Sequence, residues 1–271
     1  MMLALIKIFA YIKKEFLVQK SYKFAFFFNI FSVFTSLLTF FFINRLFGNR
    51  ITSHLEPFGR DYFSYTILAQ AFFTYVGTGL GGIAGRLRGE AMTGTLESLL
   101  VTPTKIRILL LGMGLWNFIF ASLDLFLYFF LGVFFFKIDI SQINILSALV
   151  IFFFTIVAFS SLGLISGSFI LVLKRGSPIN WLVDTLSGLL GGVYFPISVL
   201  PKYLQAVSSW IPVTYAIKGL ELAVYQGAPL GQLSGDVTKL ILFAVILLPL
   251  GIFSFNYALR RAKIEGSLVR Y

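Results

Sequence analysis

Residues that could do chemistry are sparse in this sequence, and none of them forms a catalytic or metal-binding pattern. The chain of 271 residues has 11 Asp and Glu residues, one histidine and no cysteine. The histidine, His54, has no group of acids near it in the sequence. The lack of cysteine excludes disulfides, iron–sulfur clusters and thiolate chemistry. We therefore expect no catalytic site, no metal and no cofactor bound by this chain.

A glycine-rich stretch, GTGLGG at residues 77–82, matches the G-x-G-x-x-G pattern of dinucleotide sites. Such a site needs a preceding strand and an acid about 20 residues later, within a soluble βαβ unit. The run around this stretch is apolar and offers neither. Gly77, Gly81 and Gly85 instead recur at four-residue spacing and predict a face on which another helix packs closely, as does the GxxxG pattern of residues 163–167.

Asp124 and a row of polar residues are the remaining candidates. Asp124 lies in the middle of a long apolar run, where a carboxylate costs about 3 kcal/mol if the run spans a bilayer. It is either a functional residue or a structural acid bonded to a neighbouring hydroxyl. The row has a polar residue at every fourth position: Tyr62, Thr66, Gln70, Thr74 and Thr78. Polar groups at membrane depth face other helices or water, so the row either lines a pathway or bridges helices.

The composition identifies the class of protein. Hydrophobic residues make up 58% of the chain, charged residues 12%, and the mean hydropathy is +0.90, whereas a soluble domain is about half apolar and a quarter charged. A soluble core could not bury 33 phenylalanines as well as so much Leu and Ile, so lipid must cover most of the surface. The net charge of +11 does not indicate nucleic-acid binding, because the basic residues lie at the ends of apolar runs.

The expected fold is all-α, a polytopic membrane protein with six transmembrane helices of about 20 residues or more. The apolar runs cover residues 24–46, 62–84, 104–136, 143–173, 177–195 and 237–259. Before them, residues 1–23 place apolar residues on one helical stripe away from most lysines: Leu5, Ile8, Phe9, Ile12 and Phe16. This pattern predicts an amphipathic helix in the membrane interface, with a simple extension of the first span as the alternative. The expected domains are therefore residues 1–23 and a six-span domain, residues 24–271.

Counting Lys and Arg on each side of the bilayer gives the orientation. With the N-terminus inside, 15 of the 22 basic residues fall on the inner side and 7 on the outer side. We therefore expect a multi-pass protein of the cell membrane with both termini in the cytoplasm.

Two connections are too apolar to be simple loops. Residues 85–103, on the inner side, place leucines at helical spacing among charged residues, which predicts a short amphipathic helix on the inner surface. Residues 195–221, on the outer side, are cut by three prolines into short helical pieces. Irregular backbone survives at membrane depth only when it is buried in protein or lines a cavity, so we expect a re-entrant hairpin. Its role would be an external gate formed by Phe195, Pro196, Pro201, Trp210 and Pro212.

Two stretches resemble the ABC-2 type exporter permeases, the membrane subunits of ATP-binding cassette transporters. The stretch EAMTGTLESLLVTPTKIRILL, residues 90–110, is similar to a cytoplasmic segment of that family with an acid, GTLE, two leucines and TP. The stretch YFPISVLPKYLQAVSSWIPVTYAIKGLE, residues 194–221, is similar to its external segment with FP, LP, IP and TY. With the N-terminal helix and the six spans, the resemblance covers almost the whole chain.

The resemblance implies a coupling helix within residues 85–103 that contacts a separate ABC ATPase subunit. The coupling residues would be Glu90, Gly94, Thr95, Leu96, Glu97, Leu99 and Leu100. ATP and Mg²⁺ would bind to that partner, because this chain has no Walker A sequence. The resemblance also implies a second permease copy, in a homodimer or a heterodimer. The candidates for the translocation pathway are Thr66, Gln70, Thr74 and Asp124.

These pathway candidates lack a charged binding cluster, which favours export of a hydrophobic or amphipathic cargo, such as a drug-like molecule in multidrug export or a lipid. Export of a lipid-linked polysaccharide is the alternative, because residues 20–23 (KSYK) partly match the basic, tyrosine-containing signature of glycan exporters. A membrane enzyme or scaffold without an ATPase is an alternative from another class. An enzyme would need clustered His, Asp or Glu at the membrane surface, and a scaffold would not need the inner amphipathic helix.

Overall fold

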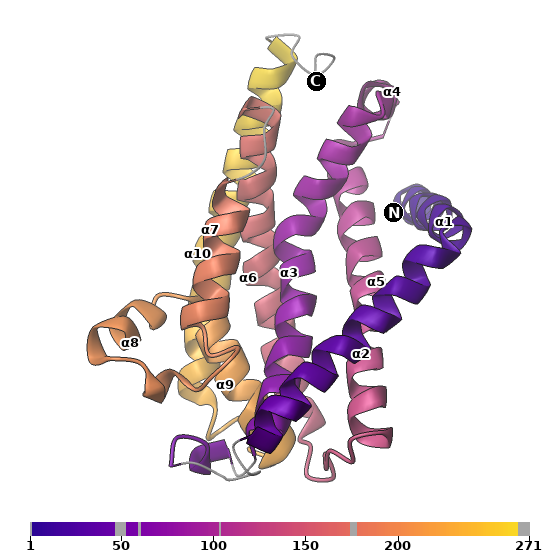
Figure 1. Cartoon of the computed structure of the whole chain (residues 1–271). Helices are drawn as coiled ribbons and strands as arrows, with labels where there is room; N and C mark the ends of the chain where they lie inside the picture. Colours follow the sequence, from indigo (N-terminus) through magenta and orange to yellow (C-terminus); the bar gives the residue numbers. More distant parts are fainter. Residues whose placement is uncertain (1, 47–52, 59–60, 103, 174–177, 265–271) are drawn as a thin grey trace.

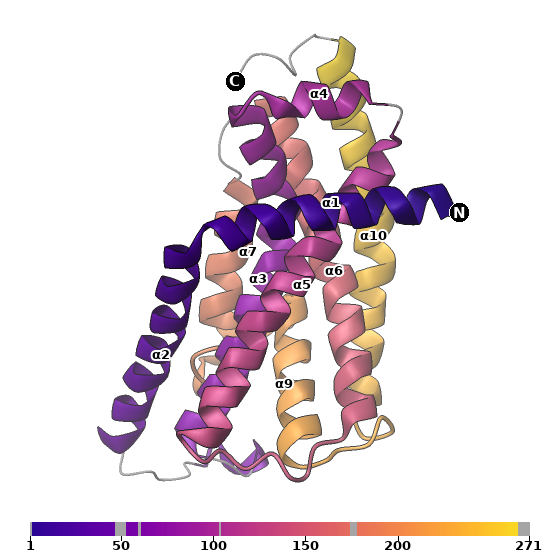
Figure 2. The ribbon, with the colours of Figure 1, turned by 90° about the vertical axis from the view of Figure 1, so that its right-hand side faces the viewer.

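The computed structural model describes residues 2–46, 53–58, 61–102, 104–173 and 178–264. Every regular element among them is a helix, which confirms the all-α class (Figure 1). Long helices run along a common direction, and one helix crosses them (Figure 2).

The crossing helix is α1 (Met2–Ser21), which turns at Tyr22 into α2 (Lys23–Leu46). α1 lies across the bundle, and α2 descends along its side (Figure 2). α1 buries Tyr11 and Glu15 against the bundle. Of its predicted apolar stripe, Leu5, Phe9 and Phe16 are exposed, and Ile8 and Ile12 are half-buried. An exposed apolar stripe suits a helix that rests on lipid. Its place in the membrane interface stays a prediction.

Five helices in the described part of the chain are long and apolar enough to cross a bilayer. They are α2, α3 (Tyr62–Met92), α5 (Ile106–Phe134), α6 (Ile145–Leu173) and α10 (Ser234–Ile264). α3 is central: it packs against both α5 and α6, and α6 packs along α10 (Figure 1). α3 is also the most buried of the five, so any movement of α3 must displace its neighbours.

Glycines allow α3 and α6 to approach closely. A Cβ placed on Gly163 of α6 would lie 2.4 Å from the carbonyl oxygen of Gly79. The predicted packing role of Gly163 is confirmed, but α6 meets α3 at Gly79 and not on the predicted face of Gly77, Gly81 and Gly85. Close packing of a helix on that face stays a prediction. Gly77 and Gly85 have open space where a Cβ would lie, and Gly81 has a neighbour only at 3.8 Å. The reason is geometric. Gly79 follows Gly77 by two residues, and over two residues a helix turns to nearly its opposite side, so Gly79 faces away from Gly77.

The predicted fifth span, residues 177–195, is not one crossing helix. α7 (Pro178–Leu190) has 13 residues, fewer than the about 20 needed to cross. Gly191 and Gly192 follow it, and Gly192 has a φ of 89°, the left-handed conformation that ends many helices. Later in the chain, α9 (Pro212–Tyr225) continues along the bundle from the level that α7 reaches (Figures 1 and 2).

Between α7 and α9 the chain forms η2 (Ile197–Val199), a 3-10 helix, and α8 (Lys202–Ser208). Both project from the side of the bundle (Figure 1). As the prolines predicted, Pro196, Pro201 and Pro212 each stand at the start of a helical piece. Re-entry of this segment into a bilayer stays a prediction.

α3 leads into α4 (Thr95–Val101), a short helix at the end of the bundle (Figure 1). Gly94 makes the turn with a φ of 72°. The expected start of the next span at residue 104 was two residues early. α5 begins at Ile106, and Thr102 instead ends α4. Pro103, which precedes the expected span, lies outside the described residues.

Candidate coupling site

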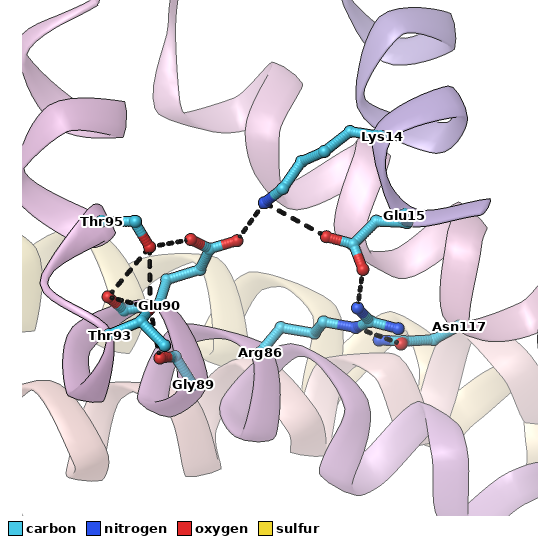
Figure 3. Close-up of polar contacts among 8 residues, drawn as sticks. All are labelled: Lys14, Glu15, Arg86, Gly89, Glu90, Thr93, Thr95 and Asn117. Atoms are coloured by element: carbon cyan, nitrogen blue, oxygen red, sulfur yellow. Dashed lines mark hydrogen bonds and ion pairs between the residues drawn. The ribbon is translucent and has the colours of Figure 1, made fainter. Parts of the chain in front are cut away.

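Charged and polar side chains gather where α3 leads into α4. We call the following six residues the polar cluster: Lys14 and Glu15 of α1, Arg86 and Glu90 of α3, Thr95 of α4 and Asn117 of α5 (Figure 3). The topology brings them together, because α1 crosses α3 and α5 near this end of the bundle (Figure 2).

Glu90 joins three helices through its two carboxylate oxygens. Lys14 donates a hydrogen bond to Oε1 over 2.6 Å and forms an ion pair there. The Thr95 hydroxyl donates to Oε2 (Figure 3). Partial burial by itself would lower the pKa of Lys14. The hydrogen bond and the attraction to Glu90, together with the attraction to Glu15, outweigh burial and raise the pKa of Lys14. Lys14 therefore stays charged. A buried carboxylate at the end of α3, only 9% exposed, therefore fixes both α1 and α4.

Glu15 and Arg86 extend the cluster to α5. Arg86 donates through Nη1 to Glu15, which also lies 3.4 Å from the ammonium of Lys14. Arg86 Nε donates to Asn117 Oδ1 over 3.0 Å. Acids and bases alternate and cancel in charge, so each buried charge has a partner. Such a cluster is suited to holding helices in register, and not to binding a charged ligand.

Apolar contacts also seat α1 on α5. The ring of Tyr11 packs on Gly112, where an added Cβ would lie 3.2 Å from the ring. Phe16 meets Trp116 edge to face, with the ring centroids 6.5 Å apart. The polar cluster is therefore built on a packed contact between the two helices.

A hollow of about 670 Å³ opens beside the polar cluster, between α1, α3 and α5. Gly81, Gly85 and Gly89 of α3 line one wall of it. At Gly85 and Gly89, apart from the backbone of α3 itself, no atom of the described residues lies within 4 Å of the place of a Cβ. The glycine face predicted for close helix packing thus faces open space in the single chain. We call this space the glycine hollow.

The predicted coupling residues divide into three groups. Glu90 and Thr95 are bonded to each other, and Gly94 forms the turn between their helices. Leu99 is half-buried on α4. Leu96, Glu97 and Leu100 also belong to α4, but their side chains lie outside the described residues. Contact of these residues with an ATPase stays a prediction.

Of the predicted pathway residues, Thr66 is fully buried and donates to the carbonyl oxygen of Tyr62 in its own helix over 2.8 Å. Gln70 is half-buried, and its Oε1 has no hydrogen-bond partner in the described part of the chain. Thr66 and Gln70 therefore differ in burial and in bonding, and a role in a pathway stays a prediction for both.

Asp124 and Thr74 bridge helices. Asn29 of α2 donates to Asp124 Oδ1 of α5 over 2.5 Å. One turn along α5, the Tyr128 hydroxyl shares hydrogen bonds with Ser36 of α2 and Thr74 of α3. These bonds form a polar seam that ties α2 to the bundle. A role in a pathway stays a prediction for both residues.

The predicted gate residues lie on the α7–α9 connection. Pro196 and Pro212 are buried, Phe195 is half-buried, and Pro201 and Trp210 are exposed. His54 Nδ1 lies 3.1 Å from the hydroxyl of Ser198 and so joins the connection between α2 and α3 to η2.

Lys14, Glu15, Arg86 and Asn117 were not predicted as site residues. Two signals could have found them. Arg86 and Glu90 are four residues apart and share a helix face, and the adjacent Lys14 and Glu15 interrupt the apolar run of the N-terminal helix.

Comparison with known proteins places the chain in a family. Residues 6–225 match the ABC-2 type transporter family, a range that includes the polar cluster, α4 and α9. The chain is 26% identical over 187 residues to the inner membrane transport permease YadH of Escherichia coli K12, covering 67% of this chain and 70% of that protein. YadH of E. coli O157:H7 and of Shigella flexneri match to the same extent. With its apolar bundle of long helices, this multi-pass membrane protein belongs to the ABC-2 type transporter family.

Proposed function

We propose that this chain is the permease subunit of an ATP-binding cassette exporter and that a separate ATPase subunit, which binds ATP and Mg²⁺, drives it. Membership of the ABC-2 type transporter family and similarity to proteins named transport permeases support the transport role. The observation that carries the coupling role is the bonding of Glu90 to both α1 and α4.

The coupling would work as a rigid-body transfer of movement. A partner that displaces α4 pulls on Glu90 through Thr95, and Glu90 lies in the last turns of α3. Lys14 passes the displacement to α1. Because α3 packs on both α5 and α6, its movement rearranges the bundle.

In this proposal the end of the bundle that carries α4 faces the cytoplasm, and both termini lie inside. A second permease copy, identical or related, completes the pathway. The open glycine face of α3 at Gly77 and Gly85 supports a partner chain, because among the described residues only the backbone of α3 itself lies within 4 Å of either added Cβ.

The proposed cargo is hydrophobic or amphipathic, a drug-like molecule or a lipid. The pathway would use Thr66, Gln70, Thr74 and Asp124, of which Asp124 alone is ionisable. Residues 195–221 would form a re-entrant external gate, which is supported by exposed apolar side chains such as Trp210 beside the buried α9.

Purification of the tagged permease from its own membrane tests the proposal. The wild type should bring with it an ATP-binding cassette subunit and ATP hydrolysis. Ser98→Arg, on the exposed surface of α4, should reduce both, whereas Ser53→Arg in the exposed connection between α2 and α3 should not. Recovery of no ATPase with the wild type, or equal recovery with both variants, would contradict the proposal.

A further inference from the structure

Glu221 is a buried acid that the coupling mechanism does not use. Its side chain on α9 is 0% exposed. Neither carboxylate oxygen has a hydrogen-bond partner among the described residues. The residues beside it on α9, Ile217 and Leu220, belong to the main apolar core. Glu221 is thus a carboxyl group in an apolar setting.

The basic residues near α9 are engaged elsewhere. Lys218 lies three residues before Glu221, a spacing that permits an ion pair on one helix face. Its ammonium instead pairs with Asp236 of α10, with Nζ 3.1 Å from Oδ2. Lys239 of α10 lies over the ring of Tyr215, 4.5 Å from the ring centroid. No cation in the described part of the chain therefore neutralises Glu221.

The other titratable groups on the elements packed against α9 do not supply a charge partner either. The described residues of α6 include no titratable side chain. Glu56 of η1 (Glu56–Phe58) and Asp184 of α7 are acids, and both are exposed. From α3, Tyr62 and Tyr65 reach this region, and Tyr65 belongs to the same apolar core as Ile217 and Leu220. An ionised carboxylate buried without a cation or a hydrogen bond is strongly unfavourable, so such a group binds a proton instead.

Tyr65 connects this acid to the α7–α9 connection. Its hydroxyl donates to the carbonyl oxygen of Gly192 over 2.5 Å, at the left-handed turn that ends α7. A cavity of about 220 Å³ lies next to this bond and is lined by Gly192, Pro196 and Ile217, among others. Ile217 precedes Glu221 by one helical turn on α9. If the connection moves outward, water that enters this cavity has one turn of helix to pass before it reaches Glu221.

We propose that Glu221 is a proton-binding site of the external gate, which holds its proton while the gate is closed and releases it to external water when the gate opens. In the closed form the carboxyl group is neutral. In the open form Gly192 no longer accepts the Tyr65 hydrogen bond, so that hydroxyl can donate to the carboxylate that remains. Reclosure takes one proton back from water. The protonation of Glu221 stands without the proposed transport function, whereas its link to the gate rests on that function.

The direction of the pH effect follows from linkage. The closed gate binds one proton more than the open gate, so a rise in external pH favours opening. The change in the open-to-closed ratio is at most tenfold for each pH unit.

Infrared spectroscopy of the purified permease tests the protonation directly. At neutral pH the wild type should show the carbonyl stretch of a neutral carboxylic acid, and this band should shift when the protein is labelled with ¹³C-glutamate. Glu221→Gln should remove the band, and the matched control Glu56→Gln on exposed η1 should not. If the labelled wild type shows only the bands of ionised glutamates, the proposal is overturned. This measurement needs the wild type alone, so it remains valid even if Glu221→Gln fails to fold.

Transport in vesicles of controlled external pH tests the link to the gate. Export by the wild-type complex should rise with external pH, and Glu221→Gln should export with little dependence on it. An unchanged pH profile in Glu221→Gln overturns the gating role even when the infrared band is present. A wild-type complex that exports nothing would refute the proposed function and leave the infrared result standing.

Discussion

Lys14 and Glu90 are 76 residues apart in the sequence, and Lys14 Nζ lies 2.6 Å from Glu90 Oε1. This contact ties the helix that crosses the bundle to the helix at its centre. Because Thr95 bonds the other oxygen of the same carboxylate, the three helices α1, α3 and α4 share one anchor.

Glu90→Gln should weaken transport while the protein still inserts and folds. Glutamine can still accept from Thr95 but cannot form the ion pair. Lys14 is 47% exposed, so the loss of stability should stay under about 1 kcal/mol. We expect a several-fold lower ratio of cargo exported to ATP hydrolysed in reconstituted vesicles. The exposed Glu56→Gln is the matched control, and an unchanged ratio in Glu90→Gln would remove this residue from the coupling.

Gly163→Ala should destabilise the bundle. Alanine gains about 1 kcal/mol over glycine in helix propensity, but its Cβ would lie 2.4 Å from the Gly79 oxygen, and overpacking costs about 1–3 kcal/mol. The measurement is thermal unfolding in detergent. Gly77→Ala, with open space round its Cβ, should be neutral or stabilising in the isolated chain. A lower melting temperature for Gly77→Ala than for Gly163→Ala would refute this account of the packing.

Asp124→Leu should loosen α2. It removes the acceptor of Asn29, and an interhelical hydrogen bond in a bilayer contributes about 1 kcal/mol. Asp124→Asn keeps a side chain that can bond to Asn29 and should retain the fold. Protease sensitivity of α2 compares the two variants. If Asp124→Asn exports at the wild-type rate, the role of Asp124 is structural and its negative charge is not needed for transport. If both variants are equally stable, the hydrogen bond between Asn29 and Asp124 does not hold α2 in place.

Cysteines introduced into this cysteine-free chain test the orientation. Ser53→Cys and Ala206→Cys should react with an impermeant thiol reagent in intact cells, and Ser98→Cys only after lysis. All three positions are exposed, so a lack of reaction reports the membrane side and not burial. Labelling of Ser98→Cys before lysis would reverse the proposed topology.

The sequence was enough to predict the class and most of the bundle, because apolar runs of about 20 residues have few solutions other than crossing helices. The predicted length of the fifth span, residues 177–195, was too great. The glycine pair at residues 191–192 ends α7, and the apolar character continues beyond the helix because residues 191–196 and α9 are also packed in protein.

Only two of the six residues of the polar cluster were predicted. Glu90 and Thr95 were found through a family resemblance. Local patterns mark Lys14 and Arg86 as unusual, but their bonds to Glu90 and Glu15 depend on the crossing of α1 over α3, which no local pattern encodes. The same holds for the glycines of α3. Their spacing is visible in the sequence, but which face meets α6 is decided by the packing of the whole bundle.

The contact between α4 and an ATPase is the centre of this account, and site-directed crosslinking measures it most directly. A photoreactive reagent attached to Ser98→Cys should crosslink the permease to an ATP-binding cassette subunit in its native membrane. The same reagent on Ser53→Cys should give no such product. Crosslinking from Ser53→Cys in place of Ser98→Cys, or from neither position in a membrane that actively exports, would contradict the account.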